Sequence, residues 1–118
     1  MKMAKLEKEV KADIKKMLEE LGAWQYMPVP NGYGMKGVPD HIACVPLKIR
    51  QDMVGQTIGA FVGIEAKQLN KDPSAHQDLQ LRNIREAKGM SFVIRGAEDE
   101  DGSFGMIKKT LFSVFGRL

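Results

Sequence analysis

The chain of 118 residues is long enough for one domain with a hydrophobic core, and 43% hydrophobic with 28% charged residues is ordinary for a globular protein. This composition argues against a disordered chain, and no stretch holds the ~18 consecutive apolar residues that a membrane span needs. The charged N-terminus lacks an apolar segment, so we expect no signal peptide. The single cysteine, Cys44, excludes an internal disulfide and fits a reducing compartment. We therefore expect a cytoplasmic protein without a membrane partner.

The net charge of +3 understates how basic most of the chain is. Four of the 15 acidic residues are consecutive, at 98–101, and the other 11 stand against 18 lysines and arginines. A basic surface with one segregated acidic segment is compatible with a polyanionic partner. An ordinary basic soluble protein accounts for the charge equally well.

The first half of the chain predicts one helix and one strand. Residues 4–21 have helical periodicity, and Gly22 is a natural C-terminal stop. The expected apolar stripe of this helix is Leu6, Val10, Ile14, Met17, Leu18 and Leu21. Residues 24–37 are rich in Pro, Gly and Asn, which indicates turns or a short irregular strand. Residues 40–47 are a strand candidate, and 48–59 form a polar excursion.

The second half alternates strands and helices. Residues 60–69 have the period of two typical of a strand, with Glu65 and Lys67 on one face. A helix is expected from Ser74, its N-cap, to a stop at Gly89. A strand over 90–96 and a final helix over about 105–115 follow. The order α-β-β-α-β-α is that of a mixed α/β domain.

The stretch at 32–41, "GYGMKGVPDH", matches the glycine pattern G-x-G-x-x-G of dinucleotide-binding turns. Such a turn must follow a strand and open a helix, because the helix N-terminus holds the pyrophosphate. Here a proline-rich segment precedes the glycines, and Val38-Pro39 follows them, which disfavours a helix. The glycines are better explained as tight turns ahead of Asp40.

Asp40 opens one predicted strand, and Glu65 and Lys67 project from one face of the next. A hairpin-like pairing of these strands would bring the three side chains together. Two carboxylates suit a hard divalent cation, which takes oxygen ligands and keeps several waters. A neighbouring lysine can stabilise an anionic transition state. These three side chains are the groups expected for metal-dependent phosphodiester hydrolysis. A structural explanation is also open, because an exposed strand face with a weak ion pair would contain Glu65 and Lys67 as well.

Three stretches, "GVPDHIACV", "FVGIEAKQL" and "SAHQDLQLRNIREAKGMSFVI", together resemble the PD-(D/E)-x-K nuclease superfamily. In particular they are similar to the VRR-NUC family, whose small stand-alone members occur in phages and bacteria. Pro39-Asp40 and Glu65-Ala66-Lys67 match the superfamily motif, and Gln77 stands where the family carries a glutamine. The resemblance spans roughly residues 6–95. It implies a restriction-endonuclease-like α/β fold, a central mixed β-sheet flanked by helices, as one domain over residues 1–118.

The resemblance also implies residue roles. Asp40, Glu65 and the backbone carbonyl of Ala66 would bind Mg²⁺ or Mn²⁺, and Lys67 would orient the attacking water. Gln77 would hold the lysine or a water, although it could also be only a capping residue. An acidic residue of the first helix belongs to the pattern. Glu9 is its best match, and Asp13 remains a rival.

The activity implied is cleavage of DNA, with structured or branched DNA such as Holliday junctions as the expected substrate. Candidate phosphate contacts are Lys36, Lys71, Arg82, Arg85 and Lys88. The apolar arc of the last helix, formed by Ile107, Leu111, Phe112, Val114 and Phe115, favours a homodimer. Two alternatives remain open: a nucleic-acid-binding module without catalysis, and a nuclease subunit that depends on a partner.

Overall fold

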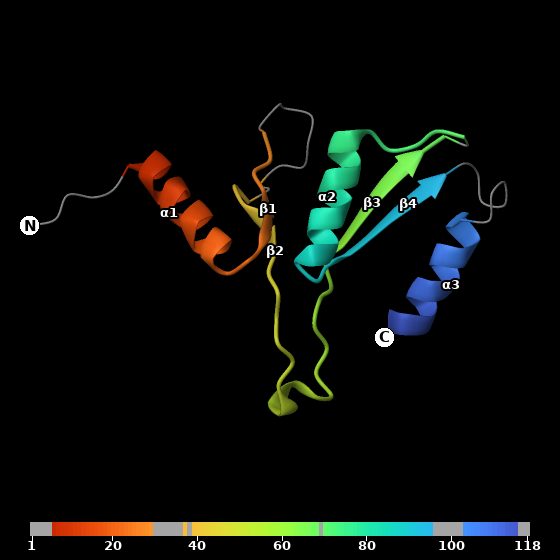
Figure 1. Ribbon diagram of the computed structural model, residues 1–118. Coiled ribbons are helices and arrows are strands. Elements are labelled where there is room, and N and C mark those ends of the chain that lie inside the picture. The colour runs from red at the N-terminus through yellow and green to blue at the C-terminus, as the bar shows by residue number, and fades with distance from the viewer. Residues whose placement is uncertain (1–5, 30–36, 38, 69, 96–102, 116–118) are drawn as a thin grey trace, which may run out of the picture. The chain divides into compact units, whose positions relative to one another are not determined.

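The structure is a computed structural model that describes residues 6–29, 37, 39–68, 70–95 and 103–115. The chain divides into two compact units, Met1–Gly59 and Ala60–Leu118, and each is described by itself. Figure 1 shows the elements in chain order. The acidic segment 98–101 and the glycine positions 32 and 34 lie outside the described residues.

The first unit contains one helix and a two-stranded sheet. Helix α1 spans Glu7–Glu20 and packs against β1, Trp24–Tyr26. Strand β1 pairs antiparallel with β2, Ile42–Cys44. Gln25 donates a hydrogen bond of 3.2 Å to the carbonyl of Lys15 in α1.

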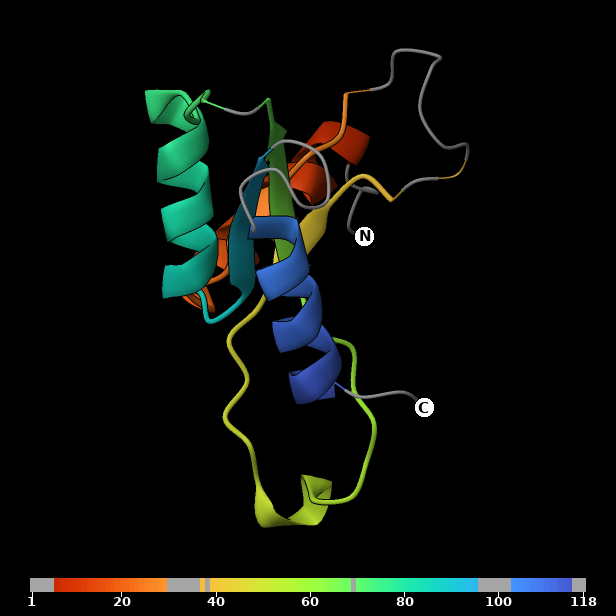
Figure 2. The same ribbon diagram turned by 90° about the vertical axis from the view of Figure 1, so that its right-hand side faces the viewer.

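The second unit is a βαβ unit followed by a helix (Figures 1 and 2). Strand β3, Val62–Lys67, runs parallel to β4, Met90–Arg95, and helix α2, Ala75–Glu86, connects them. A parallel pair requires such a crossover. Helix α3, Ser103–Phe115, packs against β4. The buried apolar residues of this unit, Leu81, Ile84 and Ala87, belong to the face of α2 and the turn after it.

The C-terminal ends of α1 and α2 both close with the paired hydrogen bonds of a Schellman motif. After α1, Gly22 is left-handed, with φ of 72°, as the sequence predicted. After α2 the left-handed residue is Lys88, with φ of 74°, and Gly89 instead donates its N–H to the carbonyl of Ile84. The predicted stop at Gly89 is therefore one residue late, because Gly89 occupies the position after the left-handed turn.

The predicted order of helices and strands is confirmed, and several elements are shorter than expected. Of the two alternatives for residues 24–37, turns or a short irregular strand, the structure has a short strand at β1. The strand expected over 40–47 is only Ile42–Cys44, and Pro46 explains part of this, since proline lacks the N–H that strand pairing needs. The last helix starts two residues before the expected 105. A short 3₁₀ helix, η1, Gln51–Met53, lies in the excursion over 48–59.

The described strands form two sheets of two strands, β1–β2 and β3–β4. The expected hairpin-like pairing of the 40–47 and 60–69 strands is not among the pairs of these sheets. A mixed α/β architecture is thus observed, whereas the restriction-endonuclease-like fold with one central sheet stays a prediction. None of the described helices is both long and apolar enough to cross a membrane.

Candidate active site

Glu65 is the centre of a polar cluster at the end of β3. The Gln77 side chain, in the first turn of α2, donates a hydrogen bond of 2.8 Å from Nε2 to Glu65 Oε1. The ammonium of Lys67 lies 3.8 Å from the same oxygen. The side chains of Glu65 and Lys67 are 28% and 23% exposed, so both are sheltered without being removed from water. The structure therefore brings together three of the predicted site residues.

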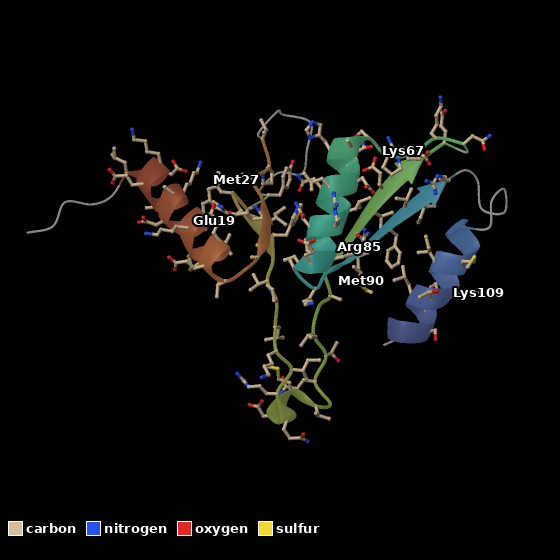
Figure 3. The ribbon with its side chains drawn as sticks, in the orientation of Figure 1. Glu19, Met27, Lys67, Arg85, Met90 and Lys109 are labelled. Atoms are coloured by element: carbon tan, nitrogen blue, oxygen red, sulfur yellow. The ribbon has the colours of Figure 1, made fainter. Side chains whose placement is uncertain are left out.

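The alternation of β3 explains why two of these residues meet. Glu65 and Lys67 are two positions apart, so their side chains lie on the same face, the face covered by α2. The predicted alternation is confirmed. Figure 3 shows Lys67 near the end of β3, beside the first turns of α2, while Arg85 lies further along that helix.

The side-chain amide of Gln77 is fixed by two partners, Ser74 and Glu65. Its Oε1 accepts a hydrogen bond of 2.9 Å from the backbone N–H of Ser74. The backbone N–H of Gln77 in turn donates a hydrogen bond of 3.1 Å to Ser74 Oγ. This reciprocal pair is the capping box predicted from the sequence. The capping bond leaves Nε2 to hold Glu65, so the capping role and the contact with the predicted site occur together in one side chain.

A glycine lets α2 come close to β3. A Cβ atom at Gly63 would lie 2.9 Å from the δ-methyl of Ile84, which is closer than real Cβ contacts. Ile84 itself is buried, 5% exposed. Gly63 is two residues before Glu65 on the same face, so this close approach sets the distance over which Gln77 reaches Glu65.

The turn from β3 to α2 is held by Arg95, the last residue of β4. Its guanidinium donates 2.9 Å to the carbonyl of Lys71 and 2.8 Å to the carboxylate of Asp72. Arg95 is the register partner of Lys67 in the parallel pair. The turn leads directly to Ser74, so this clamp fixes the start of the helix that carries Gln77.

Two oxygens near the cluster have the chemistry of ligands for a hard cation. Within the described residues, Oε2 of Glu65 accepts no hydrogen bond. The second oxygen is the carbonyl of Ala66. The N–H of Met90 in β4 bonds the carbonyl of Phe61, and backbone groups of alternate residues in a strand point to the same edge. The carbonyls of Phe61, Gly63 and Glu65 thus face β4, and that of Ala66 points to the opposite edge.

These oxygens fit a hard divalent cation better than a soft one, since carboxylates and carbonyls are the ligands of Mg²⁺ and Mn²⁺. Mg²⁺ keeps several waters and takes one or two carboxylates, so it does not need a dense cluster of side chains. In the described part of the chain, no group of three or more His, Cys, Asp and Glu side chains is arranged to hold a metal. Zinc sites use three or four such side chains, whereas Mg²⁺ is often held by one or two carboxylates and several waters.

The other predicted site residues belong to the first unit. Asp40 is exposed and lies directly before His41 and β2. Glu9 is exposed, and its carboxylate accepts a hydrogen bond of 3.1 Å from the N–H of Leu6, so it caps α1. Asp13 is exposed as well. Both ring nitrogens of His41 are buried and make no hydrogen bond with the described residues. The cluster of Glu65, Lys67 and Gln77 forms within the second unit alone.

The predicted phosphate contacts have different surroundings. Lys36 lies outside the described residues. Lys71, Arg82 and Lys88 are exposed. Arg85 donates 2.6 Å to Ser91 Oγ, which in turn donates 2.7 Å to the carbonyl of Leu81. Arg85 therefore also ties α2 to β4, a role that the sequence did not indicate.

Comparison with protein-family models, with characterised proteins and with solved structures gives no significant match to the chain. The functional interpretation therefore depends on the residues of the chain and on the geometry of the cluster around Glu65.

Proposed function

We propose that the chain is a divalent-metal-dependent endonuclease that hydrolyses phosphodiester bonds in DNA. The observation that carries the proposal is the cluster at the end of β3, where Gln77 holds Glu65 at 2.8 Å and Lys67 lies 3.8 Å from the same carboxylate. A carboxylate can hold the metal ion for such hydrolysis, a lysine can stabilise the charge that develops on the phosphate, and an amide can keep the carboxylate oriented.

In this proposal Glu65 and the carbonyl of Ala66 would hold Mg²⁺ or Mn²⁺, and Asp40 would supply a second carboxylate. When bound, such a cation polarises the phosphoryl group and makes a coordinated water more acidic. Gln77 keeps the Glu65 carboxylate in one orientation, because its amide is itself fixed by Ser74. Lys67 supplies a positive charge that stabilises the negative charge developing on the phosphate.

The restriction-endonuclease-like fold, the assignment to the VRR-NUC family and the preference for branched DNA are parts of the same proposal. They rest on the resemblance of the three sequence stretches, of which two include members of the cluster. Glu9 is a weaker part, because capping the first turn of α1 already accounts for its side chain. Asp13 remains its rival.

The test is cleavage of matched linear, flap and four-way-junction DNA by the purified protein, with and without Mg²⁺ or Mn²⁺. We expect metal-dependent cutting, with the junction or flap cut faster than the linear duplex. Asp40→Asn and Glu65→Gln should each remove most of it, since each deletes one anionic ligand. Saturable DNA binding without any cutting would instead support a binding module. Cutting that begins only when cell extract is added would support a subunit that depends on a partner.

A further inference from the structure

A pocket of about 320 Å³ adjoins the carboxylate of Glu65. Its described lining residues come from β3 and α2, so it lies along the edge of β3 that is turned away from β4. This is also the edge to which the carbonyl of Ala66 points. A ligand in the pocket would therefore lie beside the two oxygens assigned to the cation.

The lining has an apolar floor and a polar rim. Leu81 and Ile84, both buried, form the floor together with Gly63, whereas Ile64, which is 52% exposed, borders the pocket. The rim is made of His76, Gln77 and Gln80 in successive turns of α2, with Glu65 opposite. His76 and Gln80 are four residues apart and thus share one flank of the helix. Arg85, which bonds Ser91 of β4, lies on the other flank.

The character of these side chains indicates what the pocket binds. Among the described lining residues there is no lysine or arginine, so a phosphate group would find no positive charge there. The imidazole of His76 and the amide of Gln80 instead match the donors and acceptors on the edge of a nucleobase, and an apolar floor suits its face. A volume near the lower end of the ~300–1,000 Å³ range of ligand sites suits one base with part of its sugar.

We propose that this pocket, bordered by His76 and Gln80, accepts the nucleobase of an unpaired nucleotide next to the scissile phosphate. The inference rests on the proposed nuclease function and adds a determinant of its substrate. A base in intact duplex is stacked and paired and must be extruded to enter, whereas an unpaired base is available without that cost. The pocket thus selects flaps, bulges and junction crossovers over continuous duplex.

The first test compares cleavage of two DNA substrates that differ at one unpaired nucleotide beside the cut. One carries a normal base there and the other a tetrahydrofuran abasic residue, and each flanking position is tested in turn. We expect the protein to cut the base-containing DNA at least about tenfold faster at subsaturating DNA. His76→Ala and Gln80→Ala should bring the ratio close to one, because each slows cleavage of the base-containing DNA more than cleavage of the abasic DNA. Glu86→Ala, at an exposed position of α2 outside the pocket, should keep the ratio of the natural protein.

Equal rates on the two substrates would overturn the pocket assignment while leaving the nuclease intact. Equal slowing of both substrates by His76→Ala would also overturn it, since the residue would then act in the reaction or in folding. Absence of any cutting would be a failure of the proposed function and not of the pocket.

The second test decides the pocket assignment without catalysis. The protein is titrated, with EDTA present, into DNA that carries 2-aminopurine at the unpaired position. We expect a saturable change in 2-aminopurine fluorescence that His76→Ala reduces at least about fivefold in affinity or amplitude. A fluorescence change that is identical in His76→Ala and in Glu86→Ala would show that the base binds elsewhere.

Discussion

Gln77 shows how one side chain can satisfy a local rule of helix formation and a tertiary contact together. Its carbonyl oxygen completes the capping box with Ser74, and its amide nitrogen holds Glu65. A glutamate satisfies the same capping box, because Glu and Gln serve equally at this position. Only the glutamine donates a hydrogen bond to a second carboxylate. The choice of amide over acid is therefore explained by Glu65 rather than by the helix.

Exchange of this amide separates the two roles. Gln77→Glu keeps the capping box, so it should lower the melting temperature only slightly, but it should lower the cleavage rate about 10- to 100-fold, because a second negative charge replaces the donor that orients Glu65. Ser74→Ala removes the helix cap and leaves the contact with Glu65, so it should cost about 1 kcal/mol of stability with little loss of rate. Thermal melts and cleavage rates measured on both variants check this. Unchanged cleavage by Gln77→Glu would reduce Gln77 to a capping residue.

Gly63 is the residue whose size determines how closely α2 approaches β3. Gly63→Val should lower the free energy of unfolding by about 1–3 kcal/mol, since its side chain would displace the buried Ile84. Gly59 has open space around the position of a Cβ atom, so Gly59→Val is the matched control and should stay within about 0.5 kcal/mol. Urea denaturation of the two variants provides the comparison. Equal effects of the two valines would mean that the close approach of Ile84 does not limit the packing.

At the scale of elements, Arg95 connects the sheet with the site, because its hydrogen bonds join β4 to the turn before α2. The ion pair of Arg95 with Asp72 contributes little by itself, because the Asp72 side chain is 86% exposed. The hydrogen bond from Arg95 to the carbonyl of Lys71 is different, because it fixes the backbone of the turn. The position of Gln77 thus depends on a residue from the opposite end of the βαβ unit.

Removal of the hydrogen bonds from Arg95 to the turn should affect catalytic turnover more than DNA binding. Arg95→Met should lower kcat about tenfold with little change in KM, because the start of α2, and with it Gln77, loses its fixed position. Asp72→Asn, which leaves the bond to the Lys71 carbonyl, should change kcat less than about twofold. Steady-state kinetics at two salt concentrations make the measurement. If Arg95→Met instead raises KM and weakens the salt dependence of DNA binding, Arg95 is a phosphate contact.

Local rules in the sequence predicted α1, α2 and the shared face of Glu65 and Lys67, because periodicity and capping involve residues only two to four positions apart. Two tertiary contacts depend on the parallel register of β3 and β4 and on the direction in which α2 crosses them. They are the contact of Gly63 with Ile84 and that of Arg95 with the turn at 71–72. No short-range pattern carries that information. His76 and Gln80 are both exposed, and no pattern in the sequence relates them to Glu65, because a pocket between two elements depends on how those elements pack.

At the scale of the whole molecule, the homodimer stays a proposal. Helix α3 exposes large apolar side chains, with Met106 at 71% and Phe112 at 51%, while positions 114 and 115 of the predicted arc lie outside the described side chains. Sedimentation velocity should give a dimer, and Met106→Lys should shift it toward monomer, because a buried unpaired charge opposes association. A monomer at all concentrations for the natural chain would contradict this expectation.

The central claim is that Lys67 acts on phosphodiester hydrolysis beside Glu65. The most direct measurement is the single-turnover cleavage rate of the preferred DNA substrate by Lys67→Ala, with DNA affinity measured in parallel in Ca²⁺. We predict that the rate falls about a hundredfold or more while the affinity changes little, because a lone charge aimed at the transition state has been removed. Lys109→Ala, at an exposed position of α3, should behave like the natural protein. Cleavage by Lys67→Ala at the rate of the natural protein would contradict the account.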